Sequence, residues 1–541
     1  MTTVNDGLNI ALIGMATGLY LRPEYAIFGS QIATGAILLV IITALKLTYR
    51  LGFYPEYFSP LKHIHSPPNR HWLKGNTSSY FLEAPFEHMR EWVKKLPNDD
   101  LIRFYVVGNL ERLFLTSPKS LGELLVTKNY DFEKPEMIRE SLRRITGDGV
   151  LLAEGDEHKT QRKNLMPAFA YRHIKNLYPV FWAKSIEMVK MIEQDLNARP
   201  STSDNVVQVS NWASRATLDI IGIAGMDHDF DSLQDPDNTL NKSYRQIMLT
   251  PPTWLRLVFV FSFLIGYPGL SRRFPSNWNT EIMKSGEVIR SVARQMIRQK
   301  KAKMEDPAAE TGIDIVSVAL SSGTFDEENL VDQCMTFLGA GHETTASALQ
   351  WAVYALCKNP EMQTRLREEV RANLPSLSDE TPITAAQIDN LPYLNAVCNE
   401  VLRFHPSVPA TIRMSVRDTS ICGKNIPKGT LFSISPQIVN RMEEFWGPDA
   451  DEFNPDRFMG PGKANTGGAV SNYAFLTFLH GPRSCIGQGF AKAELACLLA
   501  ATVGRFQMEL KNPDAKLELR QAATVSPKDG VLAKFTLLEG W

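Results

Sequence analysis

The sequence predicts a mainly α-helical protein with smaller β regions, built as one large domain behind an N-terminal membrane anchor. Two observations carry this prediction: an uncharged apolar run lies near the start, and long helical stretches with clear stop signals dominate the rest. The predicted boundaries are 1–50 for the anchor, 51–70 for a proline-rich hinge and 71–541 for the large domain. The formal net charge of −1, from 58 basic and 59 acidic residues, gives no sign of a nucleic-acid partner.

The predicted anchor is the run Tyr25–Leu45, which carries no charged residue. About 21 apolar residues suffice to span a bilayer, which predicts a transmembrane helix at about 25–45. A cleaved signal peptide is the alternative, but the run starts late and is long for one. Lys46 and Arg50 follow it, so the positive-inside rule places the rest of the chain in the cytosol. The shorter run Leu8–Leu21 predicts an interfacial or lumenal segment, with a second membrane pass as the alternative.

The cysteines indicate a reducing compartment. All six lie in the C-terminal half of the chain, beginning at Cys334, and no two have CxxC spacing. This pattern argues against a disulfide framework and against a zinc knuckle.

Behind the hinge, Leu101–Thr116 predicts a β-hairpin with its turn at Gly108-Asn109. Farther along, Leu249–Gly269 is an apolar run that Arg256 and several prolines interrupt, so it is too broken to span a membrane. It is either part of the core or a substrate-access region that dips into the bilayer. The segment Thr524–Val531 predicts a hairpin tip near the C-terminus.

A long helix is predicted in the middle of the chain. Thr324-Phe-Asp-Glu327 has the pattern of a capping box, and Asn359-Pro360 is a stop signal after Lys358. The helix would have about 34 residues and a length of about 50 Å. At its centre lies Ala340-Gly-His-Glu-Thr-Thr345, where small residues precede an acid and a hydroxyl. This suggests a groove that holds a diatomic ligand and water, because paired threonines divert helix hydrogen bonds.

The stretch Phe478–Gly487, FLHGPRSCIG, is predicted to be a loop that runs into a helix over Gln488 to about Arg505. Cys485 then lies just before a helix N-terminus, where free N–H groups favour a thiolate. Gly481 lets the loop turn, Gly487 leaves room for a large flat group, and Arg483 could reach an anion. The arrangement suits a cysteine bound axially to haem iron. The alternative for this cysteine is a buried structural thiol.

The loop resembles the haem-binding signature of the cytochrome P450 superfamily, Phe-x-x-Gly-x-Arg-x-Cys-x-Gly. The central Ala340–Thr344 matches the family's Ala/Gly-Gly-x-Asp/Glu-Thr motif. Two more motifs follow the family's order: Glu400-x-x-Arg403 and Pro455-Asp-Arg457-Phe. The resemblance covers about residues 70 to 541 and implies the cytochrome P450 fold.

The resemblance also implies roles for single residues. Glu343 and Thr344 would deliver protons to iron-bound dioxygen. The residues that would bind the haem are Cys485 as the iron ligand, with Phe478, Gly481, Arg483, Gly487, Arg413, Arg162 and His158. In the family a tryptophan usually stands where this chain has His158. The residues that would brace the fold are Glu400, Arg403 and Arg457. The residues that would line the substrate pocket are Ala340, Val408, Ala410, Thr411 and Val525.

The implied cofactor is haem b, iron protoporphyrin IX, with an axial cysteine thiolate. The implied partners are dioxygen, a lipophilic small molecule and a separate NADPH–cytochrome reductase, with cytochrome b5 as a second electron donor. Lys159 and Lys163 form either a solvated helix face or part of a docking surface for the reductase. The expected location is the endoplasmic reticulum membrane, spanned once, with the catalytic domain cytosolic. His158 and the run GDEHKTQRK around it are similar to those of fungal members of the family that modify terpenoids or polyketides in secondary metabolism.

Two other functions are alternatives to a haem-thiolate monooxygenase. One is an electron-independent haem-thiolate isomerase or dehydratase, and the other is a non-enzymatic haem-binding protein. Enzymes of the first kind commonly lose the acid–alcohol pair, and a carrier has no use for it. This chain keeps Glu343 and Thr344, which favours a monooxygenase.

Overall fold

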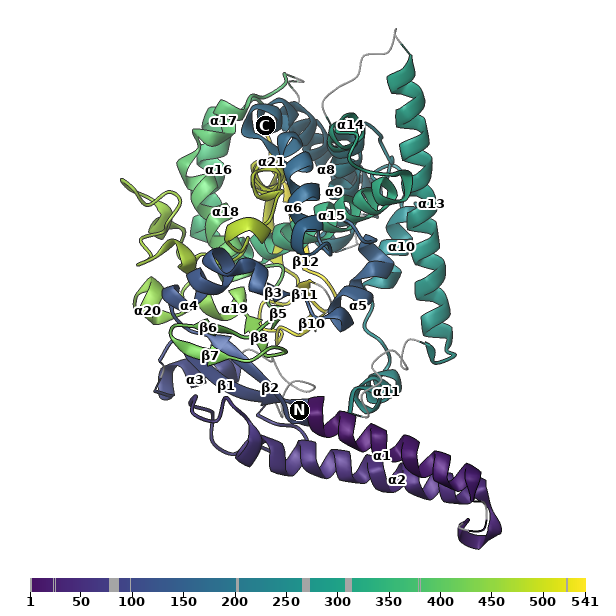
Figure 1. Cartoon of the computed structure of the whole chain (residues 1–541). Coiled ribbons are helices and arrows are strands. Elements are labelled where there is room, and N and C mark those ends of the chain that lie inside the picture. The colour runs from purple at the N-terminus through teal and green to yellow at the C-terminus, as the bar shows by residue number, and fades with distance from the viewer. Residues whose placement is uncertain are drawn as a thin grey trace. The chain divides into compact units, whose positions relative to one another are not determined.

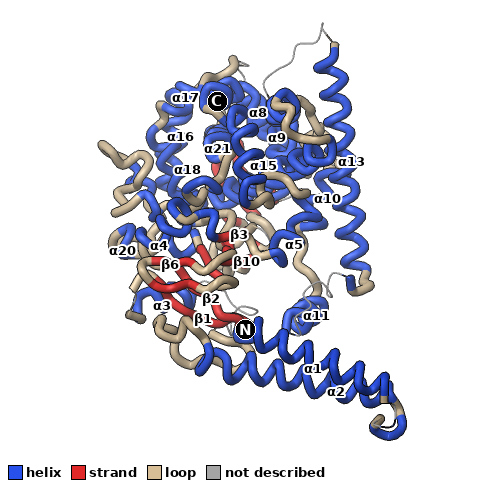
Figure 2. Tube along the Cα trace, viewed as in Figure 1, coloured by secondary structure: helices blue, strands red, loops and turns tan. Residues whose placement is uncertain are grey.

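The computed structural model describes residues 2–22, 24, 26–76, 87–97, 99–200, 204–264, 273–306, 314–377, 379, 381–521 and 524–541. Helices predominate in these ranges and the strands are short (Figure 2). The chain divides into two compact units. The first comprises Met1–Ser120, Pro251–Pro275 and Met414–Ser433, and the second comprises Leu121–Thr250, Ser276–Arg413 and Ile434–Trp541. Each is described below by itself.

The first unit begins with two helices that lie side by side and run in opposite directions, α1 (Thr2–Leu21) and α2 (Gln31–Thr48) (Figure 1). A π-helical stretch, η3 (Tyr49–Phe58), continues α2. In the described part of the chain, Gln31–Phe58 is the one helix long and apolar enough to cross a membrane. The predicted start at Tyr25 was therefore too early. Ser30 caps the helix, because its side chain accepts a hydrogen bond from the N–H of Ala33 at 3.2 Å.

The predicted hairpin is confirmed. Strand β1 (Leu101–Val106) pairs antiparallel with β2 (Leu110–Leu115), and Leu101 lies opposite Leu115. The turn is a short 3-10 segment, η4 (Val107–Asn109), in which Gly108 has a φ of 77° and Asn109 one of 50°. Strand β8 (Leu431–Ile434) extends this sheet parallel to β2. Asn109 then fastens η3 to the turn, because its Nδ2 donates to the carbonyl of Leu51 at 2.6 Å.

The remaining elements with residues in the first unit are η2 (Ile27–Gly29), α3 (Glu87–Lys95), α4 (Pro118–Gly122), α11 (Thr253–Leu264) and the antiparallel pair β6 (Thr419–Ile421) and β7 (Lys424–Ile426). Helix α11 falls in the predicted apolar run; residues 265–269 of that run lie outside the described ranges. Trp254, Leu257 and Phe261 of α11 are exposed. Because large apolar side chains seldom gather on a surface that faces water, this favours the membrane-facing interpretation of the run.

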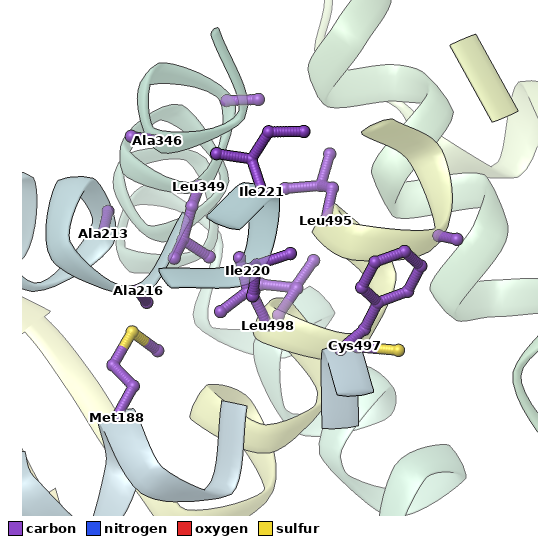
Figure 3. Packing of buried hydrophobic residues seen from close by; sticks show 14 of the residues in the cluster. Met188, Ala213, Ala216, Ile220, Ile221, Ala346, Leu349, Leu495, Cys497 and Leu498 are labelled. Carbon is purple, nitrogen blue, oxygen red and sulfur yellow. The ribbon is translucent and has the colours of Figure 1, made fainter. Parts of the chain in front are cut away.

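The core of the second unit forms around α15 (Glu327–Lys358), which packs against α9 (Val209–Met226) and α21 (Gln488–Arg505). Figure 3 shows Ile221 of α9, Leu349 of α15 and Leu498 of α21 in this core. Gly341 allows the close approach of α9, because a Cβ there would meet the side chain of Ile221 at 2.6 Å.

The predicted capping box of α15 is wrong. The N-cap is Asp326, whose Oδ1 accepts from the N–H of Asn329 at 2.8 Å, so the helix has 32 residues. Thr324 instead lies outside the helix, with its backbone N–H bonded to Ser322 Oγ.

The other elements of the second unit complete the helical framework. Its helices are α5 (Glu136–Thr146), α6 (Gly155–Leu165), α7 (Tyr171–Ile174), α8 (Tyr178–Ala198), α10 (Thr239–Ile247), α13 (Asn277–Glu305), α14 (Ile315–Ser321), α16 (Pro360–Asn373), α17 (Ala385–Asp389), α18 (Pro392–Phe404), α19 (Pro436–Val439) and α20 (Glu443–Trp446). Its short turns are η5 (Glu123–Thr127), η6 (Asn129–Asp131), η7 (Met166–Phe169), η8 (Lys175–Leu177), η9 (Pro455–Phe458), η10 (Asn472–Ala474) and η11 (Gly481–Arg483). Two short strands remain, β3 (Phe132–Glu133) and β5 (Thr411–Ser415), which pair with each other; β5 has residues in both units.

Two further sheets lie near the C-terminus. Strands β4 (Val206–Gln208), β12 (Leu532–Leu537) and β9 (Phe506–Leu510) form one, and β10 (Leu519–Gln521) pairs antiparallel with β11 (Val525–Pro527) in the other. The predicted hairpin tip at Thr524–Val531 is therefore wrong in detail. Most of that segment is the strand β11 and the turn into β12, because Val525 pairs with Gln521.

A buried ion-pair network joins α18 to the segment that follows α19. Arg403 donates to both oxygens of Glu400 at 2.7 Å, and neither side chain is exposed. Arg457 of η9 donates to Glu400 Oε1 at 3.3 Å. Arg403 also donates to the carbonyls of Asn440 and Ala450, so one guanidinium holds backbone from both ends of the segment. The three predicted bracing residues thus lie together.

Glu400→Gln should strongly destabilise the second unit, because it leaves two buried guanidinium groups without their shared counter-charge. The cost of breaking a buried ion pair is about 3–5 kcal/mol. Thermal unfolding of the purified protein should show a midpoint several degrees lower. Asp456→Asn is the matched control: it breaks the exposed pair with Arg365 in the same region, and its midpoint should stay within about one degree. Equal midpoints for the two variants would contradict the bracing role.

Candidate functional site

The loop before α21 is closed by its own backbone. The N–H of Cys485 donates to the carbonyl of Phe478 at 2.8 Å, across the turn η11. Gly481 begins this turn with a φ of 76°, and a Cβ there would lie 2.0 Å from the carbonyl oxygen of Leu125. No other residue fits at that position. The loop therefore holds Cys485 at a fixed place directly before the helix.

The thiol of Cys485 faces an internal space. Its surface is open to a solvent probe, yet the protein around it is dense enough that desolvation raises the pKa of the thiol. The N–H of Gly487 and the charge of Arg162 oppose that shift. A Cβ on Gly487 would find the ring of Phe169 as its nearest described neighbour, at 3.7 Å. The sulfur is thus accessible although the protein surrounds it.

The middle of α15 has a similar exposed surface. Ala340 is exposed and Thr344 is half-buried, although the helix around them is buried. The hydroxyl of Thr344 donates to the carbonyl of Ala340 at 2.9 Å, so it takes part in the helix's own hydrogen bonding. Glu343 between them is buried, and burial raises the pKa of its carboxyl.

The four other predicted pocket residues lie beside this part of α15 or in the strand that follows. Ser407 is the link: its hydroxyl donates to the carbonyl of Thr344, and its carbonyl accepts from the N–H of Val525, both at 2.8 Å. Val408 is exposed, and Ala410 and Thr411 are half-buried. Val525 is buried, and its carbonyl accepts hydrogen bonds from two side chains of α15. Val525 therefore packs on the helix.

Basic side chains gather around a single carboxylate in the interior. Arg483 contacts Glu154 and donates to the carbonyls of Asn129, at 3.0 Å, and Phe132. Lys134 lies 4.0 Å from the other oxygen of Glu154. Arg413 is buried and donates to its own strand. His158 is buried with its Nδ1 3.1 Å from the hydroxyl of Tyr130.

The pKa values of this cluster show that positive charge is in excess. Desolvation, with Arg413 as the next cause, lowers the pKa of Lys134 from 10.5 to about 7. Burial lowers the pKa of Arg413 to about 10, and burial together with Arg483 lowers that of His158 to about 3. Buried cations are stable when paired with anions, so the cluster fits a ligand with negative charge. Sequence reasoning missed Lys134, since only the folded chain brings it to Glu154.

Arg162 follows His158 by four residues on α6 and bonds to the loop before α21. Its guanidinium donates to the carbonyl of Ser484 at 2.6 Å and to the Ser484 hydroxyl at 3.3 Å, one residue before Cys485. A surface groove of about 600 Å³ begins at this arginine. The groove is lined by Tyr130, Lys159, Arg162, Lys163, Met166, Pro167, Ala170 and Pro482. Its lysines place positive charge on the face beside the cysteine loop.

A family model for cytochrome P450 matches residues 65–535. The chain belongs to the cytochrome P450 family. It is 59% identical over the full length of both chains to cytochrome P450 monooxygenase sphH of Aspergillus fumigatus. It is also 42% identical to cytochrome P450 monooxygenase FUM15 of Gibberella moniliformis, with 85% of each chain covered. Cytochrome P450 monooxygenase FSL4 of Gibberella zeae is 40% identical, with 91% of each chain covered.

The resemblance seen in the sequence is thereby confirmed, and so is the fold class. This P450 is a monooxygenase. The family carries haem with a cysteine thiolate on the iron, and uses dioxygen with electrons from a redox partner.

The residues of this P450 fit such a cofactor. A cysteine sulfur borders an open internal space beside a glycine. The cluster of Lys134, Arg413 and Arg483, with one carboxylate among them, fits the two propionates of a haem. The role of each single residue stays a prediction.

Haem retention by this P450 should weaken as the pH rises from about 7 to about 10. Without an anion Lys134 is half neutral near pH 7, and bound propionates would raise its pKa, so haem binding takes up a proton above that pH. Haem transfer to excess apomyoglobin should therefore quicken several-fold over this range. Lys134→Met should lose haem faster at pH 7 and show little pH dependence.

Lys159→Met is the matched control, since that lysine forms an exposed pair with Asp156. Its transfer rates should equal those of the wild type. A Lys134→Met variant that keeps the wild-type pH dependence would exclude this lysine from haem binding.

Proposed function

We propose that this chain is a membrane-anchored haem-thiolate monooxygenase of the endoplasmic reticulum. It takes electrons from a separate NADPH–cytochrome reductase and hydroxylates or otherwise oxidises a lipophilic small molecule. The observation that carries the proposal is Cys485, held before α21 with its sulfur toward an internal space. The thiolate of Cys485 would hold the iron of a bound haem b, which would supply the activation of dioxygen.

The protein's own contribution is to hold the cofactor and to move protons. Arg413, Arg483 and Lys134 would bind the propionates, with His158 beside them. Glu343 and Thr344 would pass protons into the site, since both lie on α15 next to the exposed surface of Ala340. A carboxyl whose pKa is raised by burial is suited to this work, because it holds a proton at a higher pH than an ordinary carboxyl does.

The groove lined by Arg162 supports the proposal that a redox partner docks beside the cysteine loop. Lys159 and Lys163 line it, and Arg162 is bonded to the residue before Cys485. An acidic surface on the reductase would complement these charges. Electrons would then enter on the side where the thiolate lies. Cytochrome b5 would use the same kind of contact.

The apolar surface of the first unit supports the membrane assignment. Helix α2 exposes Ile32, Leu39 and Val40, and α11 exposes Leu257 and Phe261. In this proposal α2 spans the membrane once and residues 71–541 form the cytosolic catalytic domain. A substrate that enters from the bilayer would be lipophilic. The named relatives come from fungi, which supports a terpenoid or polyketide substrate in secondary metabolism.

The carbon monoxide difference spectrum tests the function. Reduced membranes that contain this protein should show the red-shifted band of thiolate-ligated haem, and Cys485→Ser should lose it. The control is Cys357→Ser, a partly exposed cysteine at the end of α15, which should keep the band. In the same membranes NADPH should be consumed only after a reductase is added. A band that survives in Cys485→Ser would exclude this cysteine as the ligand, and NADPH use without reductase would exclude the separate partner.

Deletion of residues 2–48 tests the anchor. The deletion removes α1 and α2 but keeps η3, which Asn109 binds through Leu51. The shortened protein should be released from membranes by alkaline carbonate, whereas the full chain should stay in the pellet. Adding Leu257→Ser and Phe261→Ser should release it at neutral pH as well. A shortened protein that resists carbonate would show that the anchor lies elsewhere.

A further inference from the structure

The carboxyl of Glu343 has a different chemical group against each of its oxygens. Oε1 lies 3.5 Å from Nη2 of Arg520, and Oε2 lies 3.9 Å from Nε2 of His342. Arg520 comes from β10, far along the chain from α15. One oxygen therefore faces a permanent cation, while the other faces an imidazole nitrogen.

Arg520 is held in place by its own hairpin. Its Nη2 donates to the hydroxyl of Ser526 on β11 at 3.2 Å. Its Nε is buried and has no hydrogen-bond partner in the described part of the chain. Ser526 itself is buried, so the hairpin fixes the guanidinium beside Glu343. A cation at this distance favours the ionised carboxylate.

His342 favours the opposite state. Its Nδ1 lies 2.6 Å from the carbonyl of Leu338 and therefore carries the proton, which leaves a lone pair on Nε2. Burial lowers the pKa of His342 to about 4, so the ring is neutral at pH 7. The ring also packs edge-on against Tyr244. The lone pair on Nε2 accepts a hydrogen bond from a carboxylic acid, but it cannot donate one to a carboxylate.

The remaining charge that faces Glu343 is Arg245 of α10. Burial raises the pKa of Glu343, while Arg520 and then Arg245 act against it. Arg520 is the nearer of the two and makes the direct contact. The protonation of Glu343 thus depends on a residue of the β10–β11 hairpin.

We propose that Arg520 is a positioning residue that holds Glu343 by one oxygen as the anion. The carboxylate of Glu343 takes up a solvent proton when it turns from Arg520 toward His342, whose Nε2 accepts a hydrogen bond from the new O–H. Glu343 then releases the same proton into the site. The hairpin thereby sets the pH at which the acid of α15 is charged. This inference rests on the proposed role of Glu343 in proton delivery.

Infrared titration of the haem-loaded protein tests the proposal. The carbonyl stretch of protonated Glu343 is assigned by its loss in Glu343→Gln. Arg520→Gln should move the midpoint of that band upward by about one pH unit or more, because removal of the cation destabilises the carboxylate. Arg520→Lys should keep most of the wild-type midpoint.

The control stays beside the same hairpin. Lys528→Gln removes an exposed cation that pairs with Glu518, and it should leave the midpoint within a few tenths of a pH unit of the wild type. Ser526→Ala removes the bond that holds Arg520 but leaves its charge, and it should move the midpoint upward by less than Arg520→Gln does. A carbonyl band of protonated Glu343 that appears in Arg520→Gln but not in the wild type also supports the proposal. An unmoved midpoint, or no band in either protein, in samples that keep the thiolate–carbon monoxide band, overturns it.

A second measurement separates this inference from the function on which it rests. Hydrogen peroxide release per NADPH consumed, with reductase present, is measured against pH for the wild type, Glu343→Gln and Arg520→Gln. If Glu343 delivers protons, its variant alters the ratio, and Arg520→Gln shifts the pH profile in the direction of the infrared midpoint. A moved infrared midpoint with an unchanged ratio in Glu343→Gln would leave the positioning role intact and remove the proton-delivery role.

Discussion

Three buried cations around one carboxylate set the main constraint on the candidate site. Lys134, Arg413 and Arg483 come from separate stretches of the chain, and Glu154 is the carboxylate that contacts Lys134 and Arg483 within the described ranges. Such an arrangement is costly in a low-dielectric interior unless an anion completes it. Arg483 also belongs to the loop that carries Cys485, so the same charges that call for an anionic ligand fix the loop beside it.

The central helix meets two demands that conflict. It must pack closely against its neighbours in the core, as Gly341 does against Ile221. Its middle must keep polar groups in the interior, and each of these needs a partner. Thr344 bonds to the carbonyl of Ala340, Ser407 bonds to the carbonyl of Thr344, and Arg520 faces Glu343. The β10–β11 hairpin therefore completes a site that lies on a helix far from it in sequence.

The first unit gathers the surfaces that suit a bilayer. Helix α2 is apolar on all sides, and α11 exposes aromatic and aliphatic side chains. The sheet that begins with the hairpin β1–β2 is well buried. Asn109 bonds η3, which continues α2, to the turn of that hairpin. The apolar helix and the buried sheet are thus connected by ordered backbone.

The sequence by itself determined the elements whose signals are local. Asparagine and proline after Lys358 end α15, apolar residues on both sides of Gly108 form the hairpin, and the glycines and Cys485 mark the loop before α21. It also determined the family, because those motifs occur in a fixed order. Local signals were ambiguous where two residues could each be the N-cap of one helix. Asp326 rather than Thr324 caps α15, because its carboxylate is the better acceptor for a backbone N–H.

The tertiary structure alone decided the electrostatics. Lys134 and Arg520 stand in no motif, and their charges matter only because folding brings them to Glu154 and Glu343. Arg162 likewise bonds to Ser484, a contact that its place on α6 did not disclose. Burial and distance set the pKa of a group, and both depend on residues that belong to different elements of the chain. A linear pattern records which groups are present, whereas only the fold records which of them meet.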